Sequence, residues 1–342
     1  MIDGRVYNKV VKMNIAILGG AGFVGRSLAY NIAAKYPKYK IALVDNFSSN
    51  PHEVLDDLEK RPSVSVYEGS ISDTEFLQHV FTDMHINVVI NATYTEEEAS
   101  AIETFVTGTK NVLSLVHSGE HAIIKYIHIS SDEVYGEDPD ADEQAISPYT
   151  ETSSLRPTNP ISALQAGGDL LVQSYVNLYD IPATTLRTGN VFGPGQRVSK
   201  LFPSLIDHAL RNEDIPIYGD GTHTRDWLYV EDLLDAIDAI IQAPDAKTAG
   251  QVFNVSGELE LSILEVTELI LTILNRPKDL ITFDKANVPL HKRRVLDNSK
   301  INKAIDWLPE HDVKKAIEDT IGWYKRVLDE VYIQRGSATL GN

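Results

Sequence analysis

The sequence predicts an α/β fold, a Rossmann-type doubly wound parallel sheet with a smaller, discontinuous C-terminal lobe. Strand-like apolar runs alternate with helical patterns from Met13 to about Arg187. A glycine-rich turn ends the first of these strands, and a carboxylate ends the second. Such alternation is typical of parallel sheets, because each return of the chain to the same edge requires a crossover helix.

The first strand, expected at 13–18, runs into a turn in which Gly19, Gly22 and Gly25 stand three residues apart. A helical pattern follows over 26–35. Glycines at this spacing allow a tight turn, close approach of the backbone to a pyrophosphate, and close packing of helix on strand. The free amide groups of the helix N-terminus favour an anion there. We therefore expect a dinucleotide at this turn.

The second strand, expected at 41–44, ends in Asp45, which lies about 20 residues past the last glycine. A carboxylate at this place accepts hydrogen bonds from the hydroxyl groups of the adenosine ribose, and it repels a 2′-phosphate. The sequence therefore favours NAD over NADP.

Further apolar runs and helical patterns predict the rest of the sheet. Strands are expected at 64–67, 87–90, 123–129 and 183–186, and helices at 74–81, 99–117 and 161–178. The segment 136–160 is acidic and contains proline, so we interpret it as a long loop and candidate lid over the ligand-binding edge. Its acids are expected to form a solvated face: Glu137, Asp138, Asp140, Asp142 and Glu143.

Beyond Arg187 the alternation breaks into short strands, turns and helices. Helical patterns cover 203–211, 230–242, 263–275 and 313–331. We expect a dinucleotide-binding domain at 13–187 with some later segments, a lobe that mainly binds the substrate at 188–333, and a flexible tail at 334–342.

Composition excludes several classes of function. The chain of 342 residues has no cysteine, which excludes disulfides, thiolate catalysis and cysteine zinc sites. The net charge of −18 argues against nucleic acid as a partner. No apolar stretch approaches the ~20 residues of a membrane span, and the first residues lack the apolar segment of a secretory signal. Without a span or a signal, we expect a cytoplasmic protein. The histidines show no metal-ligand spacing, so we expect no metal site.

Polar residues follow the strand expected at 123–129, where Ser131, Asp132 and Glu133 place a hydroxyl and two adjacent carboxylates at the ligand-binding edge. Two such carboxylates can serve as a general acid and a general base if their surroundings separate their pKa values. The alternative is a strand-end turn in which Asp132 caps local amide groups.

With these motifs in place, the chain resembles the extended short-chain dehydrogenase/reductases that act on nucleotide sugars, over nearly its whole length. The motifs of the resemblance are the glycine turn, Val44-Asp45-Asn46, Ser131 to Gly136, Asn190 to Gln196, Tyr218 to Gly221, Arg225 to Asp232, and Trp323-Tyr324. The pair of Asp132 and Glu133 is most similar to the sugar-nucleotide 4,6-dehydratases, such as dTDP-glucose 4,6-dehydratase. Simple 4-epimerases usually have small polar residues there.

The resemblance implies a mechanism. A hydride passes from carbon 4 of the hexose to NAD, and the resulting ketone acidifies the hydrogen on carbon 5. Glu133 takes that proton, Asp132 protonates the leaving hydroxyl on carbon 6, and the hydride returns to carbon 6. Ser131 corresponds to the residue that hydrogen-bonds the oxygen on carbon 4.

The chain departs from the family where a tyrosine and, four residues later, a lysine begin the helix after the lid. Ile161 takes the tyrosine position and Gln165 the lysine position, so neither proton transfer nor a positive charge is available there. Loss of a positioned general base costs ~10²–10⁴-fold in rate. Tyr94 or Glu96, in an unusual loop after the strand at 87–90, is the hypothetical substitute base. The alternative is a loop that has drifted because nothing selects its sequence.

The remaining site residues are assigned by the same resemblance. The residues expected to bind the cofactor are Gly19, Gly22, Phe23, Val24, Gly25, Asp45, Asn46, Phe47, Ser48, Ser70, Ile71, Asn91, Ala92, Thr93 and Gln165. The residues expected to bind a nucleoside diphosphate sugar are Asn190, Lys200, Leu201, Tyr218, Arg225 and Arg293. A diphosphate in so acidic a chain requires local cations of this kind.

We therefore interpret the chain as an NAD-dependent enzyme that modifies a UDP- or dTDP-hexose, most like a nucleoside diphosphate-hexose 4,6-dehydratase with an altered proton relay. Two alternatives remain open: a nucleotide-sugar epimerase with an unorthodox base, and a catalytically silent protein that binds NAD and a nucleotide sugar.

A homodimer is expected, because the helices predicted at 99–117 and 161–178 match the pair that forms a four-helix bundle between subunits in this family. Their apolar positions exceed what a single core-facing stripe requires, and include Val112, Leu115, Leu170, Leu171 and Tyr175.

Overall fold

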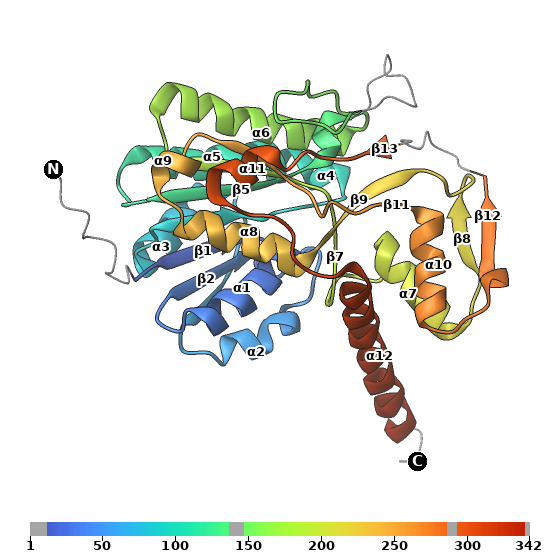
Figure 1. Cartoon of the computed structure of the whole chain (residues 1–342). Coiled ribbons are helices and arrows are strands. Elements are labelled where there is room, and N and C mark those ends of the chain that lie inside the picture. Colours follow the sequence, from blue (N-terminus) through green and yellow to red (C-terminus); the bar gives the residue numbers. More distant parts are fainter. Residues whose placement is uncertain (1–11, 137–146, 286–292, 339–342) are drawn as a thin grey trace. The chain divides into compact units, whose positions relative to one another are not determined.

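A computed structural model describes residues 12–136, 147–285 and 293–338 (Figure 1). Seven strands form one sheet in the order β10-β6-β5-β4-β1-β2-β3. The neighbouring strands whose register is described are all parallel. The sheet and its crossover helices confirm the predicted Rossmann-type α/β fold. The chain divides into two compact units, one formed by residues up to His128 with Leu171–Ala183, the other by Ile129–Leu170 with residues from Thr184 onward.

The first unit contains the strands that precede the acid pair and the helices that connect them. Its strands are β1 (Asn14–Leu18), β2 (Lys40–Asp45), β3 (Val64–Glu68), β4 (Val88–Asn91) and the start of β5 (Lys125–Ser131). Its helices are α1 (Phe23–Lys35), a 3-10 turn (His52–Leu55), α2 (Asp56–Glu59), α3 (Thr74–Met84), α4 (Glu98–Ala101), α5 (Thr109–Ser118) and the second half of α6 (Pro160–Tyr179). The inner strands β1, β2 and β4 are apolar except at their terminal residues, as expected where both faces of a parallel sheet are covered.

The helix predicted at 99–117 is not one regular α-helix. A π-helical segment, Ile102–Gly108, joins α4 to α5. The apolar pattern does not reveal it, because one widened turn shifts the helical period only locally. Val112 and Leu115, two of the apolar positions counted beyond a single core-facing stripe, lie in the apolar core of the first unit and are only 0% and 5% exposed.

The second unit begins at Ile129, within β5, and it contains the shorter strands. It includes a 3-10 turn (Asp132–Tyr135), the first half of α6, β6 (Ala183–Thr188), β7 (Asn190–Phe192), α7 (Leu201–Arg211), β8 (Ile215–Tyr218), β9 (Thr224–Tyr229) and α8 (Val230–Gln242). There follow α9 (Asp245–Thr248), β10 (Val252–Val255), β11 (Glu260–Ser262), α10 (Ile263–Ile273), a 3-10 turn (Lys278–Leu280), β12 (Ile281–Asp284), β13 (Arg293–Arg294), α11 (Ser299–Ile305) and α12 (Val313–Ala338).

Two small sheets in this unit place residues of the candidate site. Strand β9 pairs with β7, β11 and β13, and β8 pairs with β12. A capping box between Ser262 and Glu265 turns the chain from β11 directly into α10. The sequence did not predict β13, which is only two residues long, yet it brings Arg294 opposite Arg225 of β9.

The C-terminal helix differs from the prediction in its length. Helix α12 continues to Ala338, whereas the sequence pattern ended it at Val331 and predicted a flexible tail from residue 334. Residues 339–342 and the acids Glu137, Asp138, Asp140, Asp142 and Glu143 of the candidate lid lie outside the described residues. Within the described ranges, no helix has the length and apolar character needed to cross a membrane.

Candidate functional site

The glycine turn lies between β1 and α1 in the first unit. Gly19 adopts a φ of +79°, and the amides of Gly19 and Gly20 donate to the carbonyl of Val44 at 2.9 and 3.0 Å. A Cβ on Gly25 would lie 2.2 Å from the carbonyl oxygen of Gly19. Glycine is therefore required at position 25 for the helix to start this close to the strand.

Asp45 is fixed against the same turn. Its Oδ2 accepts a hydrogen bond from the amide of Ala21 at 2.9 Å, and its Oδ1 accepts one from the amide of Phe47 at 2.9 Å. Burial raises the pKa of Asp45, while these amide donors act in the opposite direction. Each carboxylate oxygen has a second lone pair, so the group retains acceptor capacity for a bound hydroxyl.

The other predicted cofactor residues of the first unit lie in the same helix start or at ends of strands. Phe23 and Val24 are the first residues of α1 and are partly buried.

The remaining predicted cofactor residues of this unit follow strands. Asn46 accepts from the amide and hydroxyl of Ser48 after β2, and Asn91 accepts from the amide and hydroxyl of Thr93 after β4. After β3, the hydroxyl of Ser70 lies 2.9 Å from that of Ser72, and Ile71 is buried. The amide of Ala92 donates to Leu18.

The acid pair belongs to the second unit and directly follows β5. The hydroxyl of Ser131 accepts from the amide of Glu133 at 3.2 Å and donates to Asp132 Oδ1 at 3.1 Å. The cap of this turn is thus Ser131, and the alternative in which Asp132 caps local amides is wrong. Asp132 is 1% exposed, whereas the Glu133 side chain is 37% exposed. The two adjacent carboxylates therefore have different surroundings, as separate acid and base roles require.

Arg294, which the sequence analysis did not single out, faces both acids. Its Nε lies 3.4 Å from Asp132 Oδ2, and its Nη2 lies 3.5 Å from Glu133 Oε1. Burial raises the pKa of Asp132, Arg294 lowers it, and the negative charge of Glu133 raises it again. No pattern in the sequence indicates this contact, because Arg294 lies far along the chain from Asp132 and Glu133.

A third carboxylate, Asp226 of β9, is electrostatically coupled to Asp132. It accepts hydrogen bonds from the hydroxyl of Ser256 and from the amides of Gly257 and Leu296. Burial raises the pKa of Asp226 to about 6, and the charge of Asp132 contributes in the same direction. The site therefore contains more carboxylate charge than its two acids alone would give.

Ile161 and Gln165 lie one turn apart near the start of α6, which places them on the same helix face. Asn159 initiates this helix by accepting from the amide of Ser162 at 2.9 Å. Gln165 is buried, and Ile161 is partly buried. Neither side chain can take a proton, so this face of α6 offers no base at these two positions.

The two hypothetical substitute bases belong to the first unit. Tyr94 is 47% exposed, and its ring meets the edge of Phe105 with 6.0 Å between ring centroids. Glu96 is also exposed. The acid pair belongs to the second unit, and the role of Tyr94 or Glu96 as a base stays a prediction.

The predicted substrate residues of the second unit differ in their exposure and in the contacts that they make. Leu201 and Tyr218 are 42% and 56% exposed, Asn190 begins β7, and Lys200 precedes α7. Arg225 is buried and donates to the carbonyl of Thr224. Arg293 makes two hydrogen bonds to Glu260, at 2.5 and 2.7 Å. A diphosphate on Arg293 would therefore meet a guanidinium that already has a carboxylate partner.

A buried ion pair that the sequence analysis missed links α6 to β6. Arg187 Nε lies 2.7 Å from Asp169 Oδ2, and both side chains are almost completely buried. Arg187 also donates to the hydroxyl of Tyr135 at 3.0 Å, and Tyr135 donates to Asn254 at 2.7 Å. The pair joins residues of two different elements, so no local sequence pattern predicts it.

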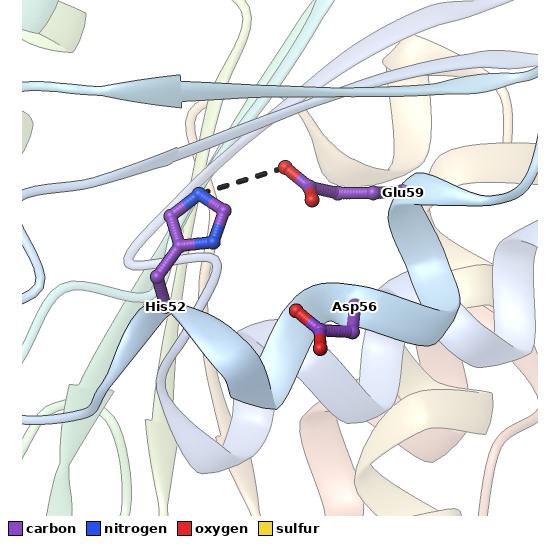
Figure 2. Close-up of side chains that lie close together, drawn as sticks. All are labelled: His52, Asp56 and Glu59. Carbon is purple, nitrogen blue, oxygen red and sulfur yellow. Dashed lines mark ion pairs between the residues drawn. The ribbon is translucent and has the colours of Figure 1, made fainter.

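His52, Asp56 and Glu59 form a group whose possible ligand atoms all lie within 4.8 Å of one another (Figure 2). The three residues are exposed, and His52 Nε2 lies 3.5 Å from Glu59 Oε1. The His52 ring packs on Phe47, with 4.6 Å between centroids. Exposed acids next to a histidine commonly form such ion pairs without a metal, so we assign this group a surface role.

Comparison with known proteins agrees with this architecture. The model of the NAD dependent epimerase/dehydratase family matches residues 15–256. The low-salt glycan biosynthesis protein Agl12 of Haloferax volcanii is 33% identical over 317 residues, which cover 91% of this chain and 98% of that protein.

Two further relatives carry names of defined reactions. The trifunctional UDP-glucose 4,6-dehydratase/UDP-4-keto-6-deoxy-D-glucose 3,5-epimerase/UDP-4-keto-L-rhamnose-reductase RHM1 of Arabidopsis thaliana is 30% identical over 91% of this chain, which spans only 47% of that protein. The crystal structure of dTDP-glucose 4,6-dehydratase from Bacillus anthracis in complex with NAD has a TM-score of 0.84 and 31% identity, and the match covers 92% of this chain and 97% of that one.

Proposed function

Because this chain belongs to the NAD dependent epimerase/dehydratase family, we propose that it binds a nucleoside diphosphate hexose and removes water across carbons 5 and 6. The observation that carries the proposal is the acid pair at the end of β5, in which a buried Asp132 and a partly exposed Glu133 share the guanidinium of Arg294. Its relatives include NAD-dependent nucleotide-sugar 4,6-dehydratases and epimerases, so an enzyme of this general kind is supported.

The cofactor is NAD, and the residues of the glycine turn fit it. Gly25 lets α1 begin in close contact with the turn, and Asp45 presents two acceptor oxygens beside the turn. When bound, NAD supplies the acceptor and the later donor of a hydride. The contribution of Asp45 is to hold the ribose and to disfavour a 2′-phosphate by charge repulsion.

The acid pair performs the proton transfers in this proposal. Once carbon 4 is a ketone, Glu133 takes the proton from carbon 5, and Asp132 gives a proton to the hydroxyl that leaves carbon 6 as water. The buried position of Asp132 suits the acid role, because burial favours its neutral form. The hydroxyl of Ser131 is a donor available to the oxygen on carbon 4.

Binding of the nucleotide part is assigned to Asn190, Lys200, Leu201, Tyr218, Arg225 and Arg293. In this proposal the diphosphate competes with Glu260 for Arg293, so the ion pair between these two residues must loosen on binding. The nucleoside, in a UDP- or dTDP-hexose, lies against the exposed side chains of Leu201 and Tyr218.

A second candidate function is a silent protein that binds NAD and a nucleotide sugar. The observation that favours it is the face of α6 with Ile161 and Gln165, which carries no proton acceptor at these positions. A nucleotide-sugar epimerase with an unorthodox base is the third reading, and it would use Tyr94 or Glu96.

The test is incubation of the protein and NAD with a panel of UDP- and dTDP-hexoses, followed by mass spectrometry. Loss of water from one substrate supports the proposal, and an isomer of unchanged mass supports the epimerase. No change across the panel, with binding retained in calorimetry, favours the silent protein. The Glu133→Gln variant is expected to lose ~10²–10⁴-fold in rate. Glu213→Gln, the same change at an exposed residue of the second unit, is the matched control.

A further inference from the structure

One guanidinium contacts both members of the acid pair through different nitrogen atoms. Arg294 presents Nε to Asp132 at 3.4 Å and Nη2 to Glu133 at 3.5 Å, and its side chain is 5% exposed. A planar guanidinium holds two partners in fixed directions, which a single ammonium group does not do. The geometry of the pair is therefore tied to one buried side chain.

The charges around Asp132 do not balance when every carboxylate is ionised. Among the described residues, the charged groups that act on Asp132 are Glu133, Arg294 and Arg225, and Asp226 is coupled to it from β9. Within this described set, three carboxylates are thus coupled to two guanidinium groups. A cluster with one negative charge in excess, in which Glu133 alone is partly exposed, favours the retention of one proton, which is what an acid and base pair needs at the start of a reaction.

The contact between Asp132 and Arg294 is electrostatic rather than hydrogen-bonded. Asp132 Oδ2 and Arg294 Nε are both buried, and neither has a hydrogen-bond partner within the part of the chain that the structure describes. Buried polar atoms are rarely left in this state without a functional reason. A proton on Oδ2 of Asp132 is therefore not held by a hydrogen bond to another described residue. The nearby guanidinium of Arg294 can stabilise the carboxylate once this proton has been transferred.

We propose that Arg294 is a positioning residue of this site, whose single guanidinium holds Asp132 and Glu133 on two of its nitrogens and stays paired while the negative charge moves from one carboxylate to the other. Before the step, Asp132 is neutral and Glu133 is charged. The bond from carbon 5 to hydrogen breaks, and its electron pair forms the double bond to carbon 6. The hydroxyl leaves carbon 6 with the proton of Asp132 as water, and Glu133 holds the proton from carbon 5. The pair carries one negative charge before and after, and Arg294 faces both positions of that charge.

The proposal rests on the function proposed above, but it can be tested without turnover. The probe is the infrared carboxyl band of Asp132, assigned by its absence in Asp132→Asn and followed over pH in the whole protein. Arg294→Gln removes the cation that lowers the pKa of Asp132, so the titration midpoint is expected to rise by about one pH unit, a tenfold change in proton affinity. Arg294→Lys keeps the charge and is expected to leave the midpoint nearly unchanged. Arg276→Gln, the same change at an exposed arginine of this unit, is the matched control.

Activity separates positioning from charge. With the hexose that the unmodified protein converts, Arg294→Lys is expected to lower kcat at least ~10-fold with little change in KM, because one ammonium cannot face both carboxylates. An unchanged midpoint in Arg294→Gln, or full kcat in Arg294→Lys, overturns the proposal. Should Arg294→Gln not fold, the kcat of Arg294→Lys decides. If the unmodified protein converts no hexose, the proposed function fails, and the infrared midpoints alone decide the role of Arg294.

Discussion

Arg187 Nε lies 2.7 Å from Asp169 Oδ2, and both side chains are buried to within a few per cent of completely. Removal of one partner from a buried ion pair leaves an uncompensated charge, which costs far more than the pair itself contributes. Asp169→Asn is therefore expected to lower the free energy of unfolding by about 3–5 kcal/mol, measured by urea denaturation.

The matched control for this substitution is Asp207→Asn. Asp207 pairs with Arg211 at 3.0 Å on α7, but these side chains are 21% and 41% exposed. Solvent screens such a pair, so the loss is expected to stay below about 1 kcal/mol. Equal losses in the two variants would show that burial does not decide the strength of the Arg187–Asp169 pair.

Asp45 is expected to control both the affinity and the choice of the dinucleotide. Its oxygens accept from the amides of Ala21 and Phe47 at 2.9 Å, so the carboxylate is held in place beside the glycine turn. Asp45→Ala should weaken NAD binding ~10–100-fold, the cost of hydrogen bonds to a charged group, and should reduce the discrimination against NADP. Isothermal titration calorimetry measures both. Tighter binding of NADP than of NAD by the unmodified protein would contradict the role given to Asp45.

The contribution of Asp226 to the stability of the protein is expected to fall between about pH 4 and pH 6. Burial raises its pKa from 3.8 to about 6, so the folded state binds this proton more tightly than the unfolded state. The stabilising contribution of Asp226 is largest where both states are protonated, and it decreases as the pH rises through this window, by about 3 kcal/mol for a shift of about two units. Asp132 and Asp45, whose pKa values burial also raises, act in the same direction.

Asp226→Asn isolates this contribution. The amide cannot titrate, so the slope of the unfolding free energy against pH should become flatter over this range, although the variant is less stable because Asn cannot accept from all the donors that Asp226 satisfies. The measurement is chemical denaturation at a series of pH values. The same slope in both proteins would mean that titration of Asp226 does not cause the pH dependence of the unfolding free energy.

A homodimer remains a prediction, and the exposed end of α6 provides its test. Leu178 and Tyr179 are 71% and 43% exposed, which is unusual for large apolar side chains side by side in sequence. Light scattering should give about twice the monomer mass of 37.9 kDa. Leu178→Asp should give the monomer, while Leu308→Asp, a change at another exposed leucine, should not. A monomer at micromolar concentration in the unmodified protein would exclude the dimer.

The centre of the sheet was predictable because strands β1, β2 and β4 are nearly continuous apolar runs, which few other structures accommodate. Strands β1 to β6 and helices α1, α3, α6, α7 and α8 lie close to the predicted ranges. The π-helical segment Ile102–Gly108 and the two-residue strand β13 were not predictable. Each depends on packing around it rather than on a repeating pattern in its own residues.

The candidate site also contains residues that the sequence predicts and residues that only tertiary contacts bring together. Ser131, Asp132 and Glu133 are adjacent in sequence, and their place at the end of an apolar strand predicts a site at the sheet edge. Arg294 reaches the pair only through the pairing of β13 with β9, a contact between segments far apart in sequence. Tertiary contacts of this kind leave no local pattern. The assignment of the cofactor, substrate and catalytic residues stays a prediction that the variants above test.

Restoring the missing tyrosine and lysine tests the acid pair more directly than deleting what remains. Ile161 and Gln165 share one face of α6, so Ile161→Tyr with Gln165→Lys places a phenol and an ammonium one turn apart, where the cation lowers the pKa of the phenol. If Asp132 and Glu133 form a working acid and base, the double variant should dehydrate a nucleotide hexose ~10²–10⁴-fold faster than the unmodified protein. Product formation is followed by mass spectrometry with NAD present.

The gain should vanish when Glu133→Gln is added to the double variant, because an amide cannot take the proton from carbon 5. The unmodified protein could instead dehydrate the hexose rapidly, and the double variant more slowly. This result would mean that a different base operates. Tyr94→Phe and Glu96→Gln then identify it, since only the variant that removes the base should lose activity ~10²-fold or more. If neither form converts any substrate while both bind UDP-sugars, the acid pair is not catalytic, and the protein is a binder of NAD and nucleotide sugars that keeps Arg294, Asp132 and Glu133 for another reason.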